Sequence, residues 1–425
     1  HFSSQLSYTP FNITKSMKIY FLGISGTFMG NLAQIAKAMG HEVIGCDCRV
    51  YPPMSDELNS SGIRFFEGYE EKNIVDADIY VIGNAISKEN RLLKEILRLE
   101  KKVISGPAWL YENILVDKKV IAVSGTHGKT TVTSMIAHAM INSNYDPNYL
   151  IAGIPNKLKK SWNISSDEVF IIEADEYDTC YFDKRPKFFH YRPSTLLINN
   201  IEFDHADIYE NVEMIENNFL KLINTMPKNS KVLINENKVS NSFKDSLNRE
   251  CFDATIELLS LDTKNIHEEN KLLAAHAIED ILPKDTVLKV LDGYIGVKRR
   301  FETIFEDKNF ELIDDFAHHP TAIEETIKMV REKTENLILI VEFGSNSMKK
   351  GIHDKSLLNI FRNQDTYMIN ASAEQGKIFL GQAKELTNND IAEICALDIK
   401  KKTILMCGNR DFQGFQKLIL DKLIK

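Results

Sequence analysis

The 425-residue sequence lacks several features that would place it in familiar classes of protein. It contains no run of about 20 apolar residues, the length that a helix needs to cross a bilayer, so membrane insertion is not expected. Its net charge is −8 rather than positive, which argues against a general nucleic-acid binder. It also lacks internal repeats and low-complexity segments. We therefore predict a folded cytoplasmic protein, a monomer or a homodimer, that binds no nucleic acid.

Cysteine is scarce as well. The six cysteines are scattered, and Cys46 and Cys48 form the only close pair. A structural zinc site would require C-x-x-C pairs with matching partners, so none is predicted. Free thiols in a reducing cytoplasm fit this usage.

What is present is an alternation of strand-like and helix-like segments, in three blocks. Residues 1–16 are polar and without pattern, so we interpret them as a tail or an expression remnant, with Met17 as the functional start. The remaining chain is too long for one core. The alternation predicts an α/β fold of three domains: a Rossmann-like N-terminal domain at 17–115, a P-loop ATPase-like central domain at 116–297 and a smaller Rossmann-like C-terminal domain at 298–425.

The first block begins with a strand at 18–22 and a glycine-rich turn, GISGTFMG, that contains Gly23, Gly26 and Gly30. The spacing G-x-x-G-x-x-x-G differs from the G-x-G-x-x-G of NAD-binding proteins. A second strand ends at Asp47. From these residues alone, a diphosphate cradle, an NAD site and a tight turn without a ligand all remain open.

The second block holds SGTHGKTT at 124–131, which lacks one feature of the usual phosphate loop. The pattern G-x-x-x-x-G-K-[ST] requires a glycine at the position of Val123. The segment nevertheless lies between a predicted strand and a helix that begins near Thr130, where free backbone N–H groups bind anions. Lys129 offers charge to the β- and γ-phosphates, and the Thr130 hydroxyl can join a Mg²⁺ shell. We therefore predict a nucleotide site of a shorter kind.

The same loop, G-T-H-G-K-T-T, resembles the ATP loop of the Mur ligases, which build the peptide of bacterial cell-wall precursors. Four further motifs stand in the order of that family: Glu173-Ala-Asp-Glu-Tyr-Asp178, Asn199-Asn-Ile-Glu-Phe-Asp-His205, Gly296-Val-Lys-Arg-Arg-Phe301 and Asp314-Asp-Phe-Ala-His-His-Pro-Thr321. The likeness covers Met17 to Lys425. Stretches such as GNAISKEN and FFHYRPS resemble most the members that join UDP-N-acetylmuramate to L-Ala-γ-D-Glu-meso-Dap.

The resemblance implies an ATP-dependent amide ligase of cell-wall peptide recycling. A muramyl carboxylate would attack the γ-phosphate of ATP, and the amine of an acceptor would then attack the acyl phosphate. ATP and Mg²⁺ are the implied cofactors. The implied partners are UDP-N-acetylmuramate and a tripeptide or amino-acid acceptor. The part expected of the protein is positioning and charge neutralisation.

The resemblance also assigns roles to single residues. Catalysis is expected from Lys129, Glu173, His205 and Arg300, and Mg²⁺ binding from Thr130, Glu173 and His205, with Glu173 and His205 sharing a second ion. Alone, Glu173 reads equally as a solvated carboxylate and His205 as a core histidine. The residues expected to contact ATP are Gly125, Thr126, His127, Gly128, Lys129, Thr130, Thr131, Asn199, Asn270, Arg300, Asp315 and His318. Those expected to contact the UDP-sugar are Gly23, Ser25, Gly26, Thr27, Gly30, Asp47, Asn84 and Ser87.

Three departures from the family pattern keep other hypotheses open. Ile266 and His267 stand where the family has His-Asn, so contacts to adenine are in doubt. A short span from His205 to Asn270 predicts a trimmed central domain. Gly344 replaces a family arginine, and a lost guanidinium affects the recognition of carboxylates. The alternatives are an L-alanine-adding ligase, a ligase with another acceptor, and an inactive descendant that binds UDP-muramate or ATP.

Closure of the domains around the substrates is also expected from the resemblance. The predicted hinges lie near residues 112–118 and 294–299. Without ligands, Arg300 could therefore lie far from Lys129.

Overall fold

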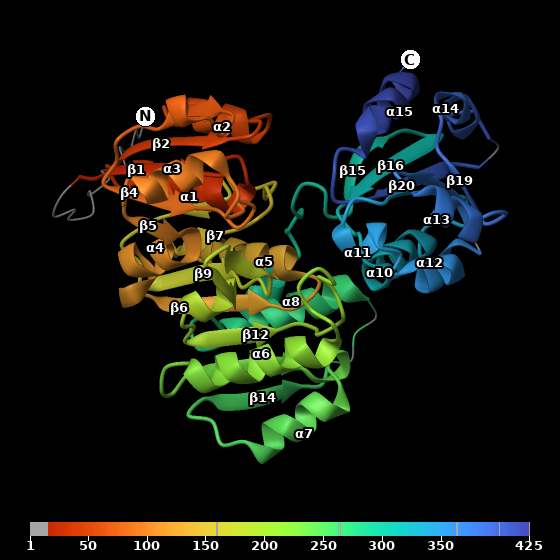
Figure 1. The fold of residues 1–425 in the computed structure, drawn as a ribbon. Coiled ribbons are helices and arrows are strands. Elements are labelled where there is room, and N and C mark those ends of the chain that lie inside the picture. Colours follow the sequence, from red (N-terminus) through yellow and green to blue (C-terminus); the bar gives the residue numbers. More distant parts are fainter. Residues whose placement is uncertain are drawn as a thin grey trace, which may run out of the picture.

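The computed structural model describes residues 16–424 except 159, 262, 264, 363 and 399, so residues 1–15 of the predicted tail lie outside the described part. Three sheets follow one another along the chain, and helices cover them (Figure 1). The predicted α/β fold with three domains is confirmed. The predicted boundaries at 115/116 and 297/298 fall between the sheets and stay predictions.

The first sheet is parallel, with strand order β3-β2-β1-β4-β5. Its strands are β1 (Lys18–Leu22), β2 (Glu42–Asp47), β3 (Arg64–Glu67), β4 (Ile79–Ile82) and β5 (Val103–Ser105), and its helices are α1 (Thr27–Ala38), α2 (Met54–Ser60), α3 (Arg91–Arg98) and α4 (Gly106–Asn113). The strand order reverses beside β1. In open parallel sheets, ligands bind at such a reversal, outside the carboxyl ends of the strands.

The central sheet has the order β14-β13-β12-β6-β9-β7-β8, and only β7 and β8 pair antiparallel. Its strands are β6 (Lys119–Ser124), β7 (Asn148–Leu150), β8 (Trp162–Asn163), β9 (Val169–Glu173), β12 (Thr195–Ile198), β13 (Lys231–Asn235) and β14 (Thr255–Leu259). The helices are α5 (Lys129–Asn142), α6 (Val212–Thr225), α7 (Asn241–Arg249), α8 (Ile266–Ala277) and α9 (Lys284–Leu291), and β10 (Asp178–Cys180) and β11 (Asp183–Pro186) form a hairpin. Because β6 lies between β9 and β12, the carboxyl ends of all three strands meet at one edge.

The third sheet has the order β15-β16-β20-β17-β18-β19, with β15 antiparallel at the edge. Its strands are β15 (Glu302–Glu306), β16 (Phe310–Asp315), β17 (Leu337–Glu342), β18 (Asp365–Ile369), β19 (Ala383–Glu385) and β20 (Lys402–Cys407). The helices are α10 (Pro320–Arg331), α11 (Asn346–Lys349), α12 (Asp354–Phe361), α13 (Ala373–Ile378), α14 (Asn388–Ile394) and α15 (Phe415–Leu423). This blue domain stands beside the other two and is joined to them by a teal segment (Figure 1).

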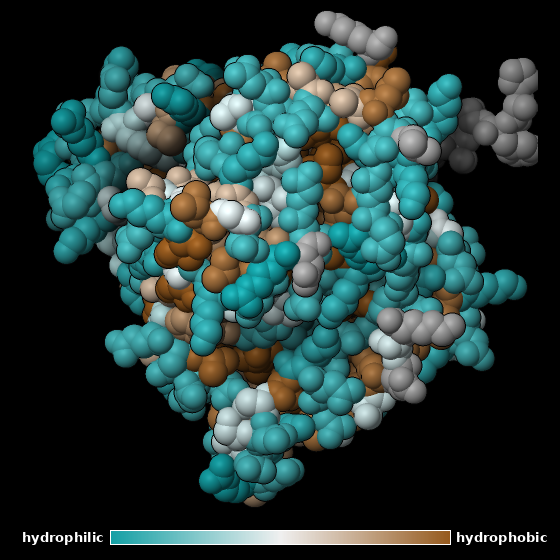
Figure 2. Space-filling view, turned by 90° about the vertical axis from the view of Figure 1, so that its right-hand side faces the viewer, coloured by the Kyte–Doolittle hydropathy of each residue, from teal (hydrophilic) through white to brown (hydrophobic). Residues whose placement is uncertain are grey.

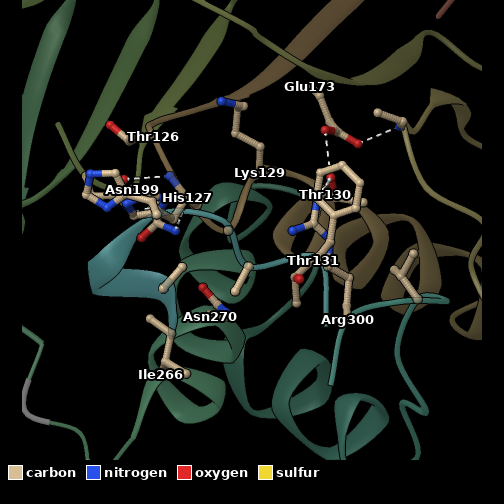
Figure 3. A pocket seen from close by; sticks show the side chains of 18 of the residues that line it. Thr126, His127, Lys129, Thr130, Thr131, Glu173, Asn199, Ile266, Asn270 and Arg300 are labelled. Atoms are coloured by element: carbon tan, nitrogen blue, oxygen red, sulfur yellow. Dashed lines mark hydrogen bonds between the residues drawn. The ribbon is translucent and has the colours of Figure 1, made fainter. Parts of the chain in front are cut away.

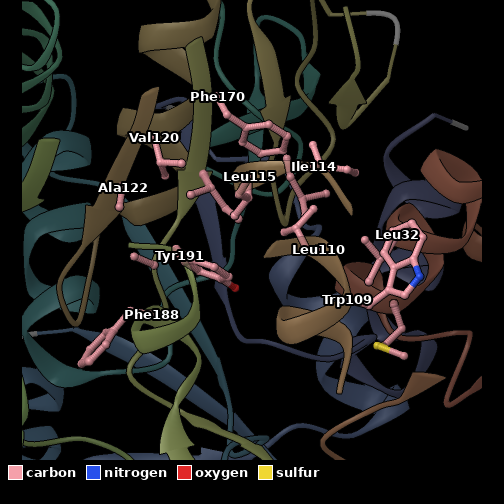
Figure 4. Packing of buried hydrophobic residues seen from close by; sticks show 14 of the residues in the cluster. Leu32, Trp109, Leu110, Ile114, Leu115, Val120, Ala122, Phe170, Phe188 and Tyr191 are labelled. Atoms are coloured by element: carbon pink, nitrogen blue, oxygen red, sulfur yellow. The ribbon is translucent and has the colours of Figure 1, made fainter. Parts of the chain in front are cut away.

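The first two domains share one hydrophobic core. Trp109 and Leu110 of α4 are fully buried, and they belong to the same apolar cluster as Phe170 of β9 (Figure 4). Ile114 and Leu115, only 6% and 2% exposed, continue this packing towards β6. Burial of apolar surface stabilises by about 25 cal/mol per Å². Two residues of the first expected hinge at 112–118, Ile114 and Leu115, thus belong to this core, which disfavours bending at these two positions.

The surface on the side of the C-terminal domain is mainly hydrophilic (Figure 2). In this view, hydrophobic residues form several small patches rather than one broad area. Scattered apolar surface of this kind is ordinary for a folded protein. Among the residues that the structure describes, no helix is both long and apolar enough to span a membrane. Whether the chain is a monomer or a homodimer stays a prediction.

Candidate active site

A short glycine loop connects β6 to α5. Gly128 precedes the helix with φ of 80°, in the left-handed region, and Gly125 has φ of 130°. A Cβ atom on Gly128 would lie 2.3 Å from Nδ2 of Asn199, and one on Gly125 would lie 2.9 Å from the backbone nitrogen of Asn200. Both backbone angles and both close approaches require glycine. Since α5 begins at Lys129, its free N–H groups stand at this loop and can bind an anion.

Residues directly after β12 form hydrogen bonds with the glycine loop. The side chain of Asn200 accepts a hydrogen bond from the His127 amide at 2.8 Å, and Nδ2 of Asn199 donates to the His127 carbonyl at 3.0 Å (Figure 3). The Thr126 hydroxyl accepts from the backbone N–H of Glu202 at 2.9 Å. These contacts fix the loop before any nucleotide binds. Asn199, predicted to contact ATP, therefore also positions the loop.

A cavity of about 660 Å³ opens over the loop, within the usual size of a ligand site. Parts of all three domains line it, including α8 of the central domain and the start of α10 in the third. The structure brings together in its lining these residues predicted for ATP, catalysis and metal: Thr126, His127, Gly128, Lys129, Thr130, Thr131, Glu173, Asn199, His205, Asn270, Arg300, Asp315 and His318. Gly125, the first residue of the loop, is the exception, because it does not line the cavity.

Lys129 is held by two carboxylates that sequence reasoning missed. Its Nζ donates to Glu176 at 3.1 Å and to the Gly125 carbonyl at 2.7 Å, and it lies 3.7 Å from Asp175. Burial alone would lower the pKa of Lys129, but Glu176 and Asp175 outweigh it, so the pKa lies above its usual value. The side chain is therefore a permanent cation beside the loop.

Thr130, Glu173 and Arg300 form a second polar group in the cavity (Figure 3). The Thr130 hydroxyl donates to Oε2 of Glu173 at 2.9 Å, and Nη2 of Arg300 donates to the Thr130 oxygen at 3.1 Å. The other oxygen of Glu173 accepts from the Ala152 amide at 2.6 Å. Burial lowers the pKa of Arg300, with Asp315 opposing, but a guanidinium stays charged at neutral pH. Arg300 thus already lies at the loop, where the sequence left an open arrangement possible.

His205 has a carboxylate partner that differs from the predicted one. Its backbone is left-handed, with φ of 54°, and its Nε2 lies 3.4 Å from Oε1 of Glu176. Ligand atoms of Asp175, Glu176 and His205 all lie within 4.8 Å of one another. Burial alone would raise the pKa of Glu176, but Lys129 and His205 hold it below its usual value. Asp175 and Glu176 belong to the E-A-D-E-Y-D motif, of which only Glu173 had been assigned a role.

A smaller cavity, of about 320 Å³, lies at the carboxyl end of β1. Its lining includes six of the residues predicted for the UDP-sugar: Gly23, Ser25, Gly26, Thr27, Asp47 and Asn84. The Asp47 carboxylate accepts from the amide and hydroxyl of Ser25 at 2.9 and 2.5 Å, and from the Tyr69 hydroxyl at 2.7 Å. Oδ2 of Asp47 therefore holds the glycine-rich turn, whereas Oδ1 accepts from Tyr69.

Two of the predicted UDP-sugar residues lie outside this lining. Gly30 is inside α1, where a Cβ atom would lie 2.2 Å from Sδ of Met54. Its role as a diphosphate contact stays a prediction, and the missing side chain lets Met54 of α2 pack against α1. Ser87 is exposed on the loop after β4 and does not line the cavity.

Lys187 is a further residue that the sequence did not single out. It lines both cavities, as does Phe28. Its Nζ donates to Asp175 at 2.8 Å. Lys187 thus lies between two cavities that are proposed to bind anionic ligands. It follows β11 and belongs to no recognisable sequence motif.

Asp315 and His318 connect the third domain to the large cavity. The Asp315 carboxylate accepts from the amides of Phe301 and Ala317, at 2.6 and 2.7 Å, so it fixes the backbone next to Arg300. Nδ1 of His318 lies 2.9 Å from the Phe316 carbonyl, and burial lowers its pKa to about 4. The helix start predicted for this motif is confirmed, because α10 begins at Pro320.

Gly344, which stands where the family has an arginine, lies beneath another arginine. A Cβ atom on Gly344 would meet Oδ1 of Asn409 at 2.2 Å and Cγ of Arg410 at 3.1 Å. Nε of Arg410 donates to the Gly344 carbonyl at 2.9 Å. The space of the missing side chain is thus filled by the loop that follows β20.

Comparison with known proteins agrees with this geometry. Three family models match in succession: the Mur ligase family catalytic domain at 18–116, the Mur ligase middle domain at 123–279 and the Mur ligase glutamate ligase domain at 299–398. The UDP-N-acetylmuramate–L-alanyl-γ-D-glutamyl-meso-2,6-diaminoheptandioate ligase of Escherichia coli (strain K12) is 33% identical, over 96% of this chain and 99% of the relative. The chain belongs to the Mur ligase family. The predicted resemblance is confirmed, and the protein is a ligase.

Other Mur ligases show the same relation. The UDP-N-acetylmuramate–L-alanine ligase of Clostridium tetani is 31% identical, over 76% of each chain. The crystal structure of a murein peptide ligase from Psychrobacter arcticus superimposes with a TM-score of 0.71 at 31% identity, covering 96% of this chain and 99% of that one. The UDP-N-acetylmuramate–alanine ligase of Thermotoga maritima, with a TM-score of 0.76 at 20% identity over 96% and 99% of the chains, shows the shared fold.

Proposed function

We propose that this Mur ligase joins UDP-N-acetylmuramate to L-alanyl-γ-D-glutamyl-meso-diaminopimelate, with ATP, in cytoplasmic recycling of cell-wall peptide. The observation that carries the proposal is similarity along the whole chain to a relative named for this reaction, at 33% identity over 96% of the residues. The L-alanine ligase of Clostridium tetani aligns with only 76%. The domain boundaries predicted above are retained as part of the proposal.

The large cavity is proposed to bind ATP by its phosphates. The glycine loop presents the N–H groups at the start of α5, and Lys129 places a charged ammonium among them. Arg300 lies on the opposite side of Thr130 and adds a second cation. Together these groups neutralise the charge that develops on the γ-phosphoryl group during transfer.

The donors in this cavity fit a divalent cation that prefers oxygen ligands. Thr130 and Glu173 place a hydroxyl and a carboxylate 2.9 Å apart, and Asp175, Glu176 and His205 gather two carboxylates and an imidazole. We propose these two groups as the Mg²⁺ ligands. Bound Mg²⁺ would supply charge neutralisation where a carboxylate approaches a polyphosphate. The protein's own part is to hold the carboxylates of Asp175 and Glu176 deprotonated beside Lys129.

The smaller cavity is proposed to bind the UDP part of the sugar nucleotide, with Ser25, Thr27 and Asn84 at its wall. Phe28 and Lys187 line both cavities, so the two cavities are neighbours. The muramyl carboxylate can therefore reach from the smaller cavity into the larger one, towards the γ-phosphate. The Lys187 ammonium attracts this carboxylate. An oxygen of the muramyl carboxylate then bonds to the γ-phosphorus as ADP leaves. In the second step the acceptor amine bonds to the acyl carbon, inorganic phosphate leaves and the amine loses a proton.

Arg410 is proposed to replace the family arginine at the acceptor site. Arg410→Ala is expected to raise the KM for the tripeptide about tenfold, because one charged hydrogen bond to a carboxylate contributes about 1.5–3 kcal/mol. The KM for ATP should change little. Initial rates at varied tripeptide concentration measure both constants.

The matched control for Arg410 is Arg362→Ala. Arg362 is an exposed arginine at the end of α12 in the same domain. Equal effects of the two substitutions on the KM for the tripeptide would contradict a specific contact by Arg410.

The proposed function is tested by phosphate release from ATP in the presence of Mg²⁺ and UDP-N-acetylmuramate, with and without the tripeptide. We expect tripeptide-dependent phosphate release and a product with the mass of UDP-muramyl-tripeptide. Turnover with L-alanine in place of the tripeptide would instead establish the L-alanine-adding activity. Binding of UDP-N-acetylmuramate without turnover of either acceptor would overturn the proposed reaction and favour either an inactive descendant or a ligase with another acceptor.

A further inference from the structure

A second group of possible ligands lies on the wall of the large cavity, apart from the carboxylates proposed for Mg²⁺. It consists of His127, Glu202 and His319, whose ligand atoms all lie within 4.8 Å of one another. The three residues come from different places in the fold. His127 belongs to the glycine loop, Glu202 follows β12, and His319 precedes α10 of the third domain. The group therefore spans the contact between the central and C-terminal domains.

The distances within this group do not match hydrogen bonds. Nε2 of His127 and Nδ1 of His319 each lie 3.5 Å from the same oxygen, Oε2 of Glu202. Hydrogen bonds between nitrogen and oxygen are usually about 2.7–3.2 Å long. In a tetrahedral metal site with bonds of about 2.0–2.1 Å, neighbouring ligand atoms lie about 3.3 Å apart. The observed spacing is thus close to the edge of a coordination tetrahedron.

The two ring nitrogens also have no hydrogen-bond partner. Nε2 of His127 and Nδ1 of His319 are both buried and unsatisfied, and His319 is only 7% exposed. Burying a polar atom without a partner costs about 1–3 kcal/mol. The imidazole rings lie with centroids 4.6 Å apart, and the His353 ring lies 4.6 Å from His319 with its own Nε2 unsatisfied. Two buried ring nitrogens without a hydrogen-bond partner that face the same carboxylate oxygen form a set of donor atoms that a metal ion can use.

We propose that His127, Glu202 and His319 bind a divalent transition-metal ion of the Zn²⁺ type. Two imidazole nitrogens and a carboxylate oxygen suit Zn²⁺, Co²⁺ or Ni²⁺ better than Mg²⁺, which prefers oxygen ligands throughout. The Thr321 hydroxyl donates to Oε2 of Glu202 at 2.6 Å and would orient the carboxylate as an outer partner.

The position of this site gives the ion a defined effect. The ion would join the glycine loop to the start of α10, so it would hold the third domain against the central one. We expect bound Zn²⁺ to keep the domains closed and to slow turnover. This effect on activity rests on the proposed function, whereas the binding itself does not.

The test is a titration of the metal-free full chain with Co²⁺, in millimolar Mg²⁺ that saturates the oxygen-rich sites. We expect one equivalent of Co²⁺ with the visible absorption of a four-coordinate nitrogen-ligated ion, displaced by Zn²⁺. His319→Gln and Glu202→Gln should each weaken Co²⁺ binding at least tenfold, since even outer partners of metal ligands contribute about 10–100-fold. The matched control His205→Gln should keep the absorption.

The proposal is overturned if no Co²⁺ binds at micromolar concentration, or if His205→Gln removes the absorption while His319→Gln keeps it. X-ray absorption of the Zn²⁺-loaded wild-type chain gives a result independent of the variants. We expect two imidazole nitrogens and one carboxylate in the first coordination sphere, with bonds of about 2.0–2.1 Å. A sphere of oxygen atoms alone would also exclude this site. This readout needs no catalytic activity, so it separates the site from the ligase assignment.

Discussion

Arg300→Ala is expected to lower the turnover number about 10³-fold, because an arginine at a transferred phosphoryl group contributes about 10³–10⁵ in kcat. Arg300 is a half-buried cation that donates to the Thr130 hydroxyl at 3.1 Å, and its guanidinium lies 4.7 Å from the centre of the Phe316 ring. The KM for ATP should change less than kcat, since the added charge matters most in the transition state. Initial rates of ADP formation at saturating substrates give the result.

The neighbouring residue provides the control. Arg299 pairs with Asp314 at 3.2 Å and donates to the Gly408 carbonyl at 2.9 Å, so it fixes the connecting segment to the third sheet. Arg299→Ala is expected to lower the free energy of unfolding by about 1 kcal/mol while keeping most of the turnover. Wild-type turnover of Arg300→Ala would contradict its role at the γ-phosphate. Equal losses in both variants would mean that the segment only needs to be ordered.

Lys129→Ala is expected to reduce kcat/KM for ATP about 10³-fold, the upper range for loss of one donor that stabilises developing charge. It should also destabilise the chain without nucleotide. Glu176 is only 2% exposed and would lose the ammonium that lies 3.1 Å away, and an unpaired buried charge costs about 3–5 kcal/mol. Stopped-time assays and thermal unfolding measure the two effects.

The double variant Lys129→Ala, Glu176→Gln separates the two effects. Removing the stranded carboxylate charge should restore most of the unfolding free energy, because the buried pair is then neutral. It should not restore turnover, since the phosphate cation is still absent and a proposed Mg²⁺ ligand is changed as well. A double variant that regains activity would show that Lys129 acts only by balancing Glu176.

The residues that could be predicted from the sequence are those set by local structure. Lys129 and Thr130 follow a strand and a glycine whose left-handed backbone precedes a helix. The strand end, the glycine and the helix start lie within a few residues of one another, so the sequence alone can reveal them. No local sequence pattern of this kind surrounds Lys187 or Arg410. Lys187 follows the β10–β11 hairpin and reaches the cavities through the tertiary fold, and Arg410 reaches Gly344 only because β20 lies beside β17.

The pairing of His205 shows the same limit. The family resemblance implied that His205 shares an ion with Glu173, which stays a prediction, and the structure places its imidazole 3.4 Å from Glu176. Gly30 shows the converse. A glycine in a glycine-rich turn looks like a ligand contact, yet its neighbour Met54 comes from another helix. Spacing along a sequence gives the residue types of a site more surely than the partner of each residue.

The core shared by the first two domains has a consequence for the energetics of binding. Because Trp109, Leu110 and Phe170 belong to one buried cluster, the distance between the two cavities is fixed when the chain folds. The entropic cost of bringing the two nucleotides together is then met by folding rather than by ligand binding. The free energy of ligand binding is then not needed to bring the first two domains together. The two proposed nucleotide sites are therefore already at their working distance from each other before either ligand binds.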